Sequence, residues 1–316
     1  MPEPIMQVKN VSKVFRASGG RSLRANNNVS LDFYPGKTLG IIGESGCGKS
    51  TLMRMLISLD KPTEGKIYFK GRDISVLKGR ELWEHRRHIQ MVFQDPYLSI
   101  NPKMRVRDII CEPLLNFGLI KQSEKDAKAR ELLEKVELPG DFAGRYPHNM
   151  SGGQCQRIGI ARAFALQPEI ILCDEATAAL DVSVQKRIIE LLKHLQQENN
   201  IAMGFVCHDM ALVGQVSDQI AVMYLGNIVE LMPADYLRAD AKHPYTNALI
   251  SAVFDLNMDF SRRIEVIQGE VPSPLDAPKG CPFRNRCPHC MERCAVEQPQ
   301  LKDIGTDHKV ACHLFD

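Results

Sequence analysis

The chain has 316 residues, of which 44% are hydrophobic and 25% are charged. This balance is that of an ordinary globular protein, and the length allows one large domain with a smaller one. The formal net charge of +2 gives no reason to expect a nucleic-acid-binding protein.

The sequence contains no segment that predicts a membrane span or a secretion signal. Residues 1–5 are not a basic stretch followed by an apolar one. Apolar runs such as residues 170–173 are far shorter than the ~20 residues needed to cross a bilayer. We therefore expect a cytosolic protein that meets a membrane only through a partner.

The first forty residues alternate between apolar and polar side chains, which predicts short antiparallel strands. The alternating apolar positions are Met6, Val8, Val11, Val29, Leu31 and Phe33. Between them, residues 17–28 are rich in glycine and asparagine, which predicts a polar loop.

A buried strand at residues 39–42 leads into a glycine-rich loop and then into a predicted helix over residues 51–59. The loop matches the pattern G-x-x-x-x-G-K-[ST] with Gly43, Glu44, Ser45, Gly46, Cys47, Gly48, Lys49, Ser50 and Thr51. Backbone N–H groups of such a loop bind phosphate oxygens, and the helix N-terminus adds positive potential. We expect Lys49 to reach the β- and γ-phosphates of ATP and Ser50 to hold Mg²⁺; the alternative is a chance glycine turn.

Strands alternate with helices along the rest of the first two-thirds of the chain. Strands are predicted at residues 67–69, 88–93, 170–173, 201–207 and 220–224, with mostly helical structure over residues 105–165. Val184, Ile188, Leu191, Leu192 and Leu195 have the spacing of one helix face. This order predicts an α/β fold with a parallel sheet and a helical insertion.

Two acidic residues follow the apolar run at residues 170–173. A buried strand that ends in an acid is a common way to position a magnesium ligand, and we assign this role to Asp174. Glu175 would then lie beside the γ-phosphate and accept a proton from the attacking water. Without the phosphate loop, the same residues would indicate only a strand end.

The cysteines are unevenly distributed, because five of the ten lie within the last thirty-six residues. These five are Cys281, Cys287, Cys290, Cys294 and Cys312. In a reducing cytosol such a group favours metal ligation over disulfides. Thiolates at Cys281, Cys287, Cys294 and Cys312 could hold zinc or an iron–sulfur cluster, and reduced cysteines without metal are the alternative.

One short motif narrows the class of nucleotide-binding protein. Residues 150–154, with Ser151, Gly152, Gly153 and Gln154, resemble the signature sequence of ABC transporter ATPases. We expect Ser151 to cap the helix that follows. The resemblance implies an ABC ATPase cassette with a parallel-sheet phosphate-loop core, an antiparallel β subdomain and a helical subdomain. It also implies that the signature of one subunit completes the ATP site of a second.

The same resemblance assigns roles to four further residues. Gln94 matches the glutamine that senses the γ-phosphate and Mg²⁺, and its loop contacts the membrane subunit in the family. His208 matches the switch histidine, Asp181 lies in the D-loop, and Phe15 stands where an aromatic side chain stacks on adenine. A satisfied histidine and a core phenylalanine are the plain alternatives.

The sequence departs from the family pattern at three positions near these motifs. Met150 replaces the usual leucine, Ala178 replaces a serine, and Cys155 replaces a residue that is often arginine. We expect the change at Cys155 to weaken a contact near the subunit interface. The residues expected to perform hydrolysis are all present.

Over nearly its whole length the chain resembles ATP-binding subunits of oligopeptide, dipeptide and nickel importers. The supporting segments are residues 93–102, 243–246, 269–274, 280–283, 286–288 and 310–313. The resemblance implies residues 1–232 as the ATP-binding domain, with a helical subdomain at about 95–165, and 233–316 as a cysteine-rich extension. It implies a [4Fe–4S] cluster at the four cysteines, with Cys290 as a spare.

The subgroup also implies the assembly in which the chain works. It implies a second, different ATPase subunit, two permeases, an external substrate-binding protein and a peripheral position on the cytoplasmic face of the membrane. The alternatives are an ATPase for nickel or another solute, a soluble ABC ATPase of translation or DNA repair, and a partner that no longer hydrolyses ATP.

Overall fold

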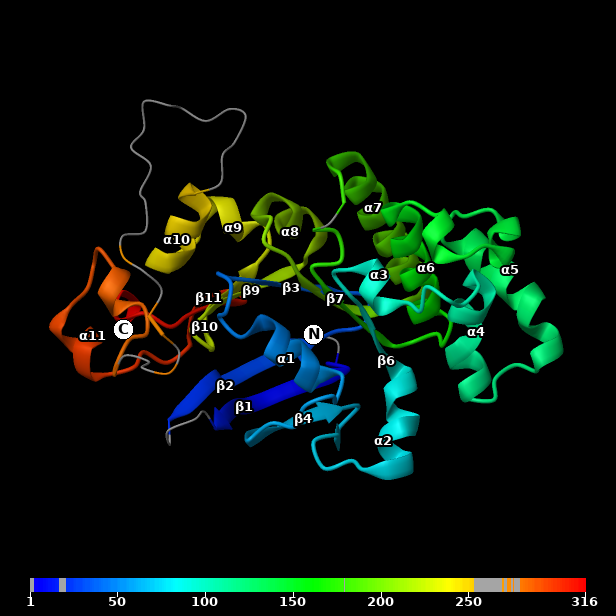
Figure 1. The fold of residues 1–316 in the computed structure, drawn as a ribbon. Coiled ribbons are helices and arrows are strands. Elements are labelled where there is room, and N and C mark those ends of the chain that lie inside the picture. Colours follow the sequence, from blue (N-terminus) through cyan, green and yellow to red (C-terminus); the bar gives the residue numbers. More distant parts are fainter. Residues whose placement is uncertain are drawn as a thin grey trace. The chain divides into compact units, whose positions relative to one another are not determined.

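The computed structural model describes residues 3–16, 21–178, 180–252, 269, 272–273, 275 and 279–316. Three sequence-based expectations reach beyond these residues: part of the polar loop over 17–28, Ala179 of the D-loop, and half of the 269–274 segment. The described chain forms two compact units, and Figure 1 shows their elements.

The first unit contains Tyr34–Lys37 and Leu77–Val206. Its strands β6 (Ile89–Val92), β7 (Ile170–Asp174) and β8 (Ala202–Val206) pair in parallel, with β7 in the middle. Its helices are α2 (Gly79–His85), α3 (Pro96–Ser99), α4 (Val106–Asn116), α5 (Lys125–Lys135), α6 (Gly152–Phe164) and α7 (Val182–Asn199). Residues 170–173 are fully buried, as expected for a strand covered on both faces.

Helices α4, α5 and α6 pack together in the segment that was predicted to be helical (Figure 1). The helix α5 buries Ala129, Leu132 and Leu133 on one side and exposes its charged residues on the other. This is the pattern that the helical spacing of apolar residues predicts.

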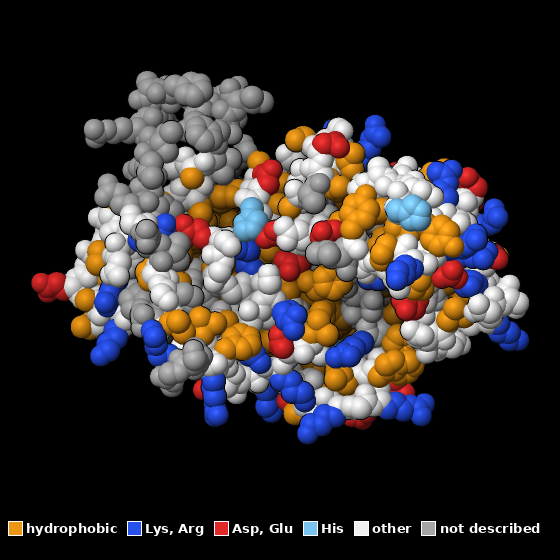
Figure 2. Space-filling model, in the orientation of Figure 1, with side chains coloured by type: hydrophobic (Ala, Val, Ile, Leu, Met, Phe, Trp, Pro, Cys, Tyr) orange, Lys and Arg blue, Asp and Glu red, His pale blue; other side chains and the backbone are white. Residues whose placement is uncertain are grey.

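The second unit contains Pro4–Phe33, Thr38–Val76 and Cys207–Asp316. Its first sheet is antiparallel, in the order β2 (Ser22–Phe33), β1 (Met6–Arg16), β4 (Glu64–Phe69), β5 (Arg72–Asp73). Lys and Arg side chains line the border of the molecule over β1, β2 and β4 (Figure 2).

The other strands of the second unit are β3 (Thr38–Ile42), β9 (Gln219–Tyr224), β10 (Asn227–Pro233), β11 (Lys302–Gly305) and β12 (His308–Val310). β3 is parallel to β9, and β10 pairs antiparallel with both β9 and β12. The helices are α1 (Lys49–Leu56), α8 (Met210–Val216), α9 (Tyr236–Ala239), α10 (Pro244–Ser251) and α11 (Glu292–Val296). The cysteine-rich tail therefore ends by adding two strands beside β10.

The predicted polar loop over residues 17–28 is wrong from Ser22 onward, because β2 begins there. The asparagines of this segment are hydrogen-bonded strand residues. The side-chain amide of Asn26 is buried and donates to the carbonyl oxygen of Gly48 at 3.2 Å. The amide of Asn27 donates to Asn227 Oδ1 at 2.7 Å. Tertiary hydrogen bonds here override the turn preference of asparagine.

None of the described helices combines the length and hydrophobicity that a bilayer-spanning segment requires.

Candidate functional site

The predicted phosphate loop lies between the buried strand β3 and helix α1, in the second unit. Gly43 has a φ of 150°, and a side chain there would come within 2.1 Å of the carbonyl oxygen of Met223. Gly48 has a φ of 107°, and a Cβ atom would meet the carbonyl oxygen of Ala25 at 2.2 Å. Only glycine fits these two positions.

The first turn of α1 has the features of an anion site. Gly48 is the N-cap residue, and no side chain caps the helix. The N–H groups of the first turn are therefore available to an external acceptor such as a phosphate. Ser50, the predicted magnesium ligand, is exposed at this end of the helix.

Lys49 lies folded back against the loop that precedes it. Its Nζ donates to the carbonyl oxygens of Gly43 at 2.7 Å and Glu44 at 2.9 Å. The thiol of Cys47 lies 3.7 Å from the same ammonium group. Burial raises the pKa of Cys47, and the charge of Lys49 opposes that increase. The lysine is thus 5% exposed and held at the phosphate loop by backbone carbonyls.

Two other predicted residues lie in the same unit as the phosphate loop. Phe15, on β1, is 38% exposed, and the ammonium group of Lys13 lies 5.1 Å from its ring centre. An exposed ring on a strand can offer a face for stacking. His208 is exposed, and the side chain of the next residue, Asp209, caps helix α8.

In the first unit, Asp174 and Glu175 lie at the carboxyl end of β7. Asp174 is opposite Val206 in the parallel register, and the N–H of Glu175 donates to the carbonyl oxygen of Val206 at 2.9 Å. Glu175 has a φ of 49°, which is uncommon for a residue with a side chain. Strained backbone of this kind is concentrated at functional sites.

The segment around Gln94 is fixed to helix α6. Gln94 itself is exposed. The hydroxyl of Tyr97 donates to the carbonyl oxygen of Met150 at 3.2 Å, and Arg162 donates to the carbonyl oxygen of Ser99 at 2.7 Å. The structure therefore brings the Gln94 segment and the signature segment together within one unit.

Ser151 begins helix α6 with a complete capping box. Its hydroxyl accepts from the N–H of Gln154 at 3.3 Å, and the Gln154 side chain accepts from the N–H of Ser151 at 3.0 Å. This confirms the predicted cap. A Cβ atom on Gly153 would lie 2.5 Å from Val184 Cγ1, so glycine allows α6 and α7 to approach closely. Asp181 caps α7 by accepting from the N–H of Val184.

Cys155, where the family often has an arginine, faces the interior of its own unit. Cys155 is fully buried, and its thiol lies 3.6 Å from the carbonyl oxygen of Pro147. Burial raises the pKa of this thiol, which keeps it neutral. The residue therefore belongs to the packing of the helical region. The sequence could not show this, because helix N-terminal positions can face either way.

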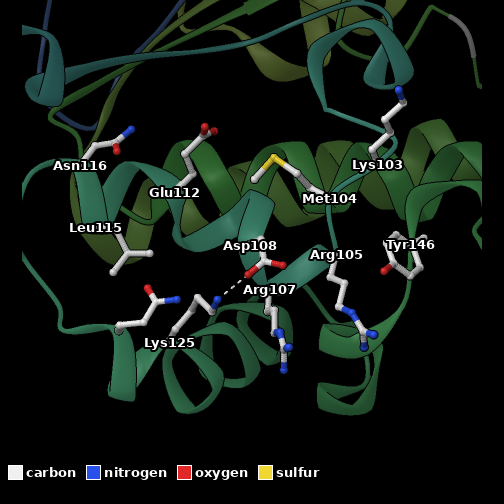
Figure 3. Close-up of a pocket in the computed structure, with 11 residues that line it drawn as sticks. Lys103, Met104, Arg105, Arg107, Asp108, Glu112, Leu115, Asn116, Lys125 and Tyr146 are labelled. Atoms are coloured by element: carbon white, nitrogen blue, oxygen red, sulfur yellow. Dashed lines mark hydrogen bonds and ion pairs between the residues drawn. The ribbon is translucent and has the colours of Figure 1, made fainter.

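A pocket of about 480 Å³ lies in the helical region and contains none of the predicted site residues (Figure 3). Four basic residues and two acidic ones line it: Lys103, Arg105, Arg107, Lys125, Asp108 and Glu112. Lys125 pairs with Asp108 at 2.5 Å, and the guanidinium of Arg105 lies 5.3 Å from the ring centre of Tyr146. Its lining residues are spread over more than forty positions, so no short motif signals it.

The cysteine-rich segment lies in the second unit with the phosphate loop. Cys281 and Cys294 are buried, and the N–H of Cys281 donates to the carbonyl oxygen of Cys294 at 2.8 Å. Burial, together with the nearby thiols of Cys294, Cys312 and Cys287, raises the pKa of Cys281 to about 12. The four thiols therefore share one small region, although the described residues contain no group of three or more side chains placed to hold a metal.

Two family models match the chain. Residues 26–178 match the model described as ABC transporter, and residues 229–294 match the C-terminal region of oligopeptide/dipeptide transporters. The oligopeptide transport ATP-binding protein AppF of Bacillus subtilis (strain 168) is 46% identical over 322 residues, with 99% of this chain and 98% of AppF covered.

Solved structures agree with these matches. The ATP-binding cassette MJ0796, in a dimeric post-hydrolysis state with ADP and Pi, superposes with a TM-score of 0.66 and 34% identity. The match covers 72% of this chain and 98% of that one. The cbiO1 protein of Clostridium perfringens, part of the ABC transporter complex cbiONQ, gives 0.67 at 25% identity, with 75% and 92% of the two chains covered.

These likenesses confirm the predicted ABC ATPase cassette and its α/β class. They also confirm the expected activity class, an ABC-type ATP hydrolase. The chain belongs to the ABC transporter ATP-binding proteins, in the group that carries the oligopeptide/dipeptide transporter C-terminal region.

Proposed function

We propose that the chain binds and hydrolyses ATP to drive the uptake of di- and oligopeptides through a membrane-embedded ABC importer. The observation that carries this proposal is the match of residues 229–294 to the peptide-transporter C-terminal region, beside a complete set of ABC motifs. AppF, which is similar over its full length, is named as an oligopeptide transport protein. No comparable feature favours nickel, another solute or a function outside transport.

The proposed ATP-binding roles rest on the phosphate-loop pattern and on the match to the ABC transporter family. The loop N–H groups and Lys49 would bind the phosphates, and Phe15 would stack on adenine. Magnesium, which would neutralise phosphate charge, would be held by Ser50, Asp174 and Gln94. Ser50 and Gln94 have exposed side chains, which a ligand can reach without rearrangement of the core.

For hydrolysis, Glu175 is the residue that would accept the proton. Water attacks the γ-phosphorus, the bond to the bridging oxygen breaks, and the proton of the water passes to the Glu175 carboxylate. His208 would contact the γ-phosphate. Ser151, Gly152, Gly153 and Gln154 of one chain would complete the site of a second, together with Asp181. The capping box at Ser151 fixes the start of α6, which is the part that would face the nucleotide of the second chain.

The working assembly would contain a second, different ATPase subunit, two permeases and an external substrate-binding protein. In it the chain would lie on the cytoplasmic face of the membrane as a peripheral subunit. The dimeric cassette MJ0796 supports pairing of two ATPase chains. Residues 1–232 would form the ATP-binding domain, with the helical subdomain at about 95–165, and 233–316 the extension.

We further propose that Cys281, Cys287, Cys294 and Cys312 hold a [4Fe–4S] cluster, with zinc as the alternative. Support comes from their number, from their irregular spacing and from the closeness of the thiols, since three of them raise the pKa of Cys281. The four cysteine side chains would have to move closer together when the cluster binds. Iron and acid-labile sulfide, about four of each per chain after anaerobic purification, are expected. Zinc alone, or no metal, would reject the cluster.

Transport is tested by membrane reconstitution. The chain, its partner subunit and the two permeases are placed in liposomes, and the uptake of a labelled oligopeptide is measured with the binding protein present. ATP-dependent uptake that stops when this chain is omitted is the expected result. ATPase activity that is coupled to nickel but not to any peptide would overturn the proposal.

A further inference from the structure

Glu44, within the phosphate loop, is bonded in three directions. Its carbonyl oxygen accepts from the Nζ of Lys49 at 2.9 Å. Its N–H donates to the hydroxyl of Tyr245 at 2.9 Å. Its carboxylate accepts two hydrogen bonds from the guanidinium of Arg286, at 2.7 and 2.9 Å. Two of these three partners come from the C-terminal part of the chain, 201 and 242 positions away.

The partners of Glu44 are themselves firmly held. The side chain of Arg286 is 6% exposed, and that of Glu44 is 24% exposed. Tyr245 is fully buried, with its ring centre 4.6 Å from Tyr224 and 5.3 Å from Phe283. A two-bond Arg–carboxylate pair shielded from water is stronger and more directional than a surface ion pair.

The location of Arg286 connects this contact to the cysteine-rich segment. Arg286 lies in a single-turn 3-10 helix (Arg284–Arg286), whose next residue is Cys287. The N–H of Arg286 donates to the carbonyl oxygen of Phe283, which is part of the aromatic group around Tyr245. Arg286 and Tyr245, both from the C-terminal part of the chain, thus contact the same residue of the phosphate loop, Glu44.

We infer that Arg286 and Tyr245 are positioning residues of the ATP site, which act through Glu44. By fixing the side chain and N–H of Glu44, they set the place of the carbonyl group that holds Lys49. They also restrict the conformations of the phosphate loop, whose N–H groups must converge on phosphate oxygens. The C-terminal segment is then part of the nucleotide site, independently of any metal that its cysteines bind.

The inference predicts a specific kinetic effect. A loosened Glu44 weakens the preorganisation of the loop for nucleotide and leaves Glu175, in the other unit, unaltered. The KM for ATP is therefore expected to rise much more than kcat falls. Loss of a charge-assisted pair of this kind corresponds to a rise in KM of about tenfold.

The experiment compares variants in the full chain, assembled with its partner subunit. Arg286→Gln and Tyr245→Phe are expected to raise the KM for ATP, with kcat within about twofold, and Arg286→Lys should restore part of the loss. Arg293→Gln is the matched control, because Arg293 lies in the same segment and forms a similar two-bond pair with Glu297. Its KM is expected to stay at the wild-type value.

A double-mutant cycle gives the decisive comparison. Glu44→Gln, which leaves the tail intact, should raise KM like Arg286→Gln, and the double variant should be no worse than either single variant. An unchanged KM in folded Arg286→Gln, additive effects in the double variant, or an equal effect of Arg293→Gln would overturn the inference. If Arg286→Gln does not fold, Glu44→Gln and Tyr245→Phe decide by the same KM criterion.

Discussion

The phosphate loop and the signature segment are both glycine-rich turns before a helix, yet the structure holds them in different ways. The signature segment is fixed partly by its own residues, since Ser151 and Gln154 cap each other, and partly by Tyr97, which lies 53 positions before Met150 and donates to its carbonyl oxygen. The phosphate loop is fixed by distant residues: Met223 behind Gly43, and Tyr245 and Arg286 around Glu44.

This difference has a consequence for function. The phosphate loop must keep one shape to surround a nucleotide, and contacts from across its own unit restrict it. The signature segment is expected to act on the nucleotide of a second chain. Its own chain therefore needs only to keep the N–H groups at the start of α6 accessible to that nucleotide. Variants in the two regions should therefore fail at different steps: ATP binding in one and turnover of the assembly in the other.

The largest effect on binding is expected from Lys49→Ala. Its ammonium group is the buried charge at the loop, so its loss should weaken ATP binding by about 100-fold or more. Titration of the chain with ATP by calorimetry measures this. Arg54→Ala, on the same helix but in an exposed pair with Asp60, is the control and should bind ATP normally.

The next largest effect is expected from Gly153→Ala, which should disturb the signature segment and leave the phosphate loop intact. The added methyl group would press on Val184, move the start of α6 and lower the ATPase rate of the assembled complex by about tenfold, while ATP binding by the chain stays unchanged. Gly159→Ala on the same helix is the matched control, because the added Cβ would meet no side chain or neighbouring element within 4 Å. Equal ATPase rates in the two variants would show that the approach of α7 to α6 does not matter.

The smallest effect is expected from Ser151→Ala, measured as stability. Loss of the cap hydroxyl should lower the free energy of unfolding by about 1 kcal/mol. Chemical denaturation of the isolated chain, monitored by circular dichroism, gives this value. A stability equal to wild type would mean that the capping box contributes nothing in this chain.

The sequence predicted local features well because their causes are local. The strand–loop–helix order at Gly43–Ser50, the cap at Ser151 and the apolar strand before Asp174 are each visible within ten residues. The parallel pairing of strands followed from their alternation with helices. These features were sufficient to identify the family.

Contacts between distant residues could not be predicted in the same way. Nothing in the spacing of Glu44 and Arg286 indicates that they meet, and the asparagines of β2 favour a loop by composition although their tertiary hydrogen bonds hold them in a strand. The close approach of Gly153 and Val184, and the addition of β11 and β12 beside β10, also depend on tertiary packing. Single-sequence patterns do not contain this information.

The central claim, that this chain is a working ATPase whose site is completed by a partner, is tested most directly by Glu175→Gln. The variant is combined with the partner subunit and permeases, and ATP binding and turnover are measured together. We expect wild-type ATP affinity with a turnover reduced at least about 100-fold, because the proton acceptor is missing. Unchanged turnover in that assembly would contradict the account.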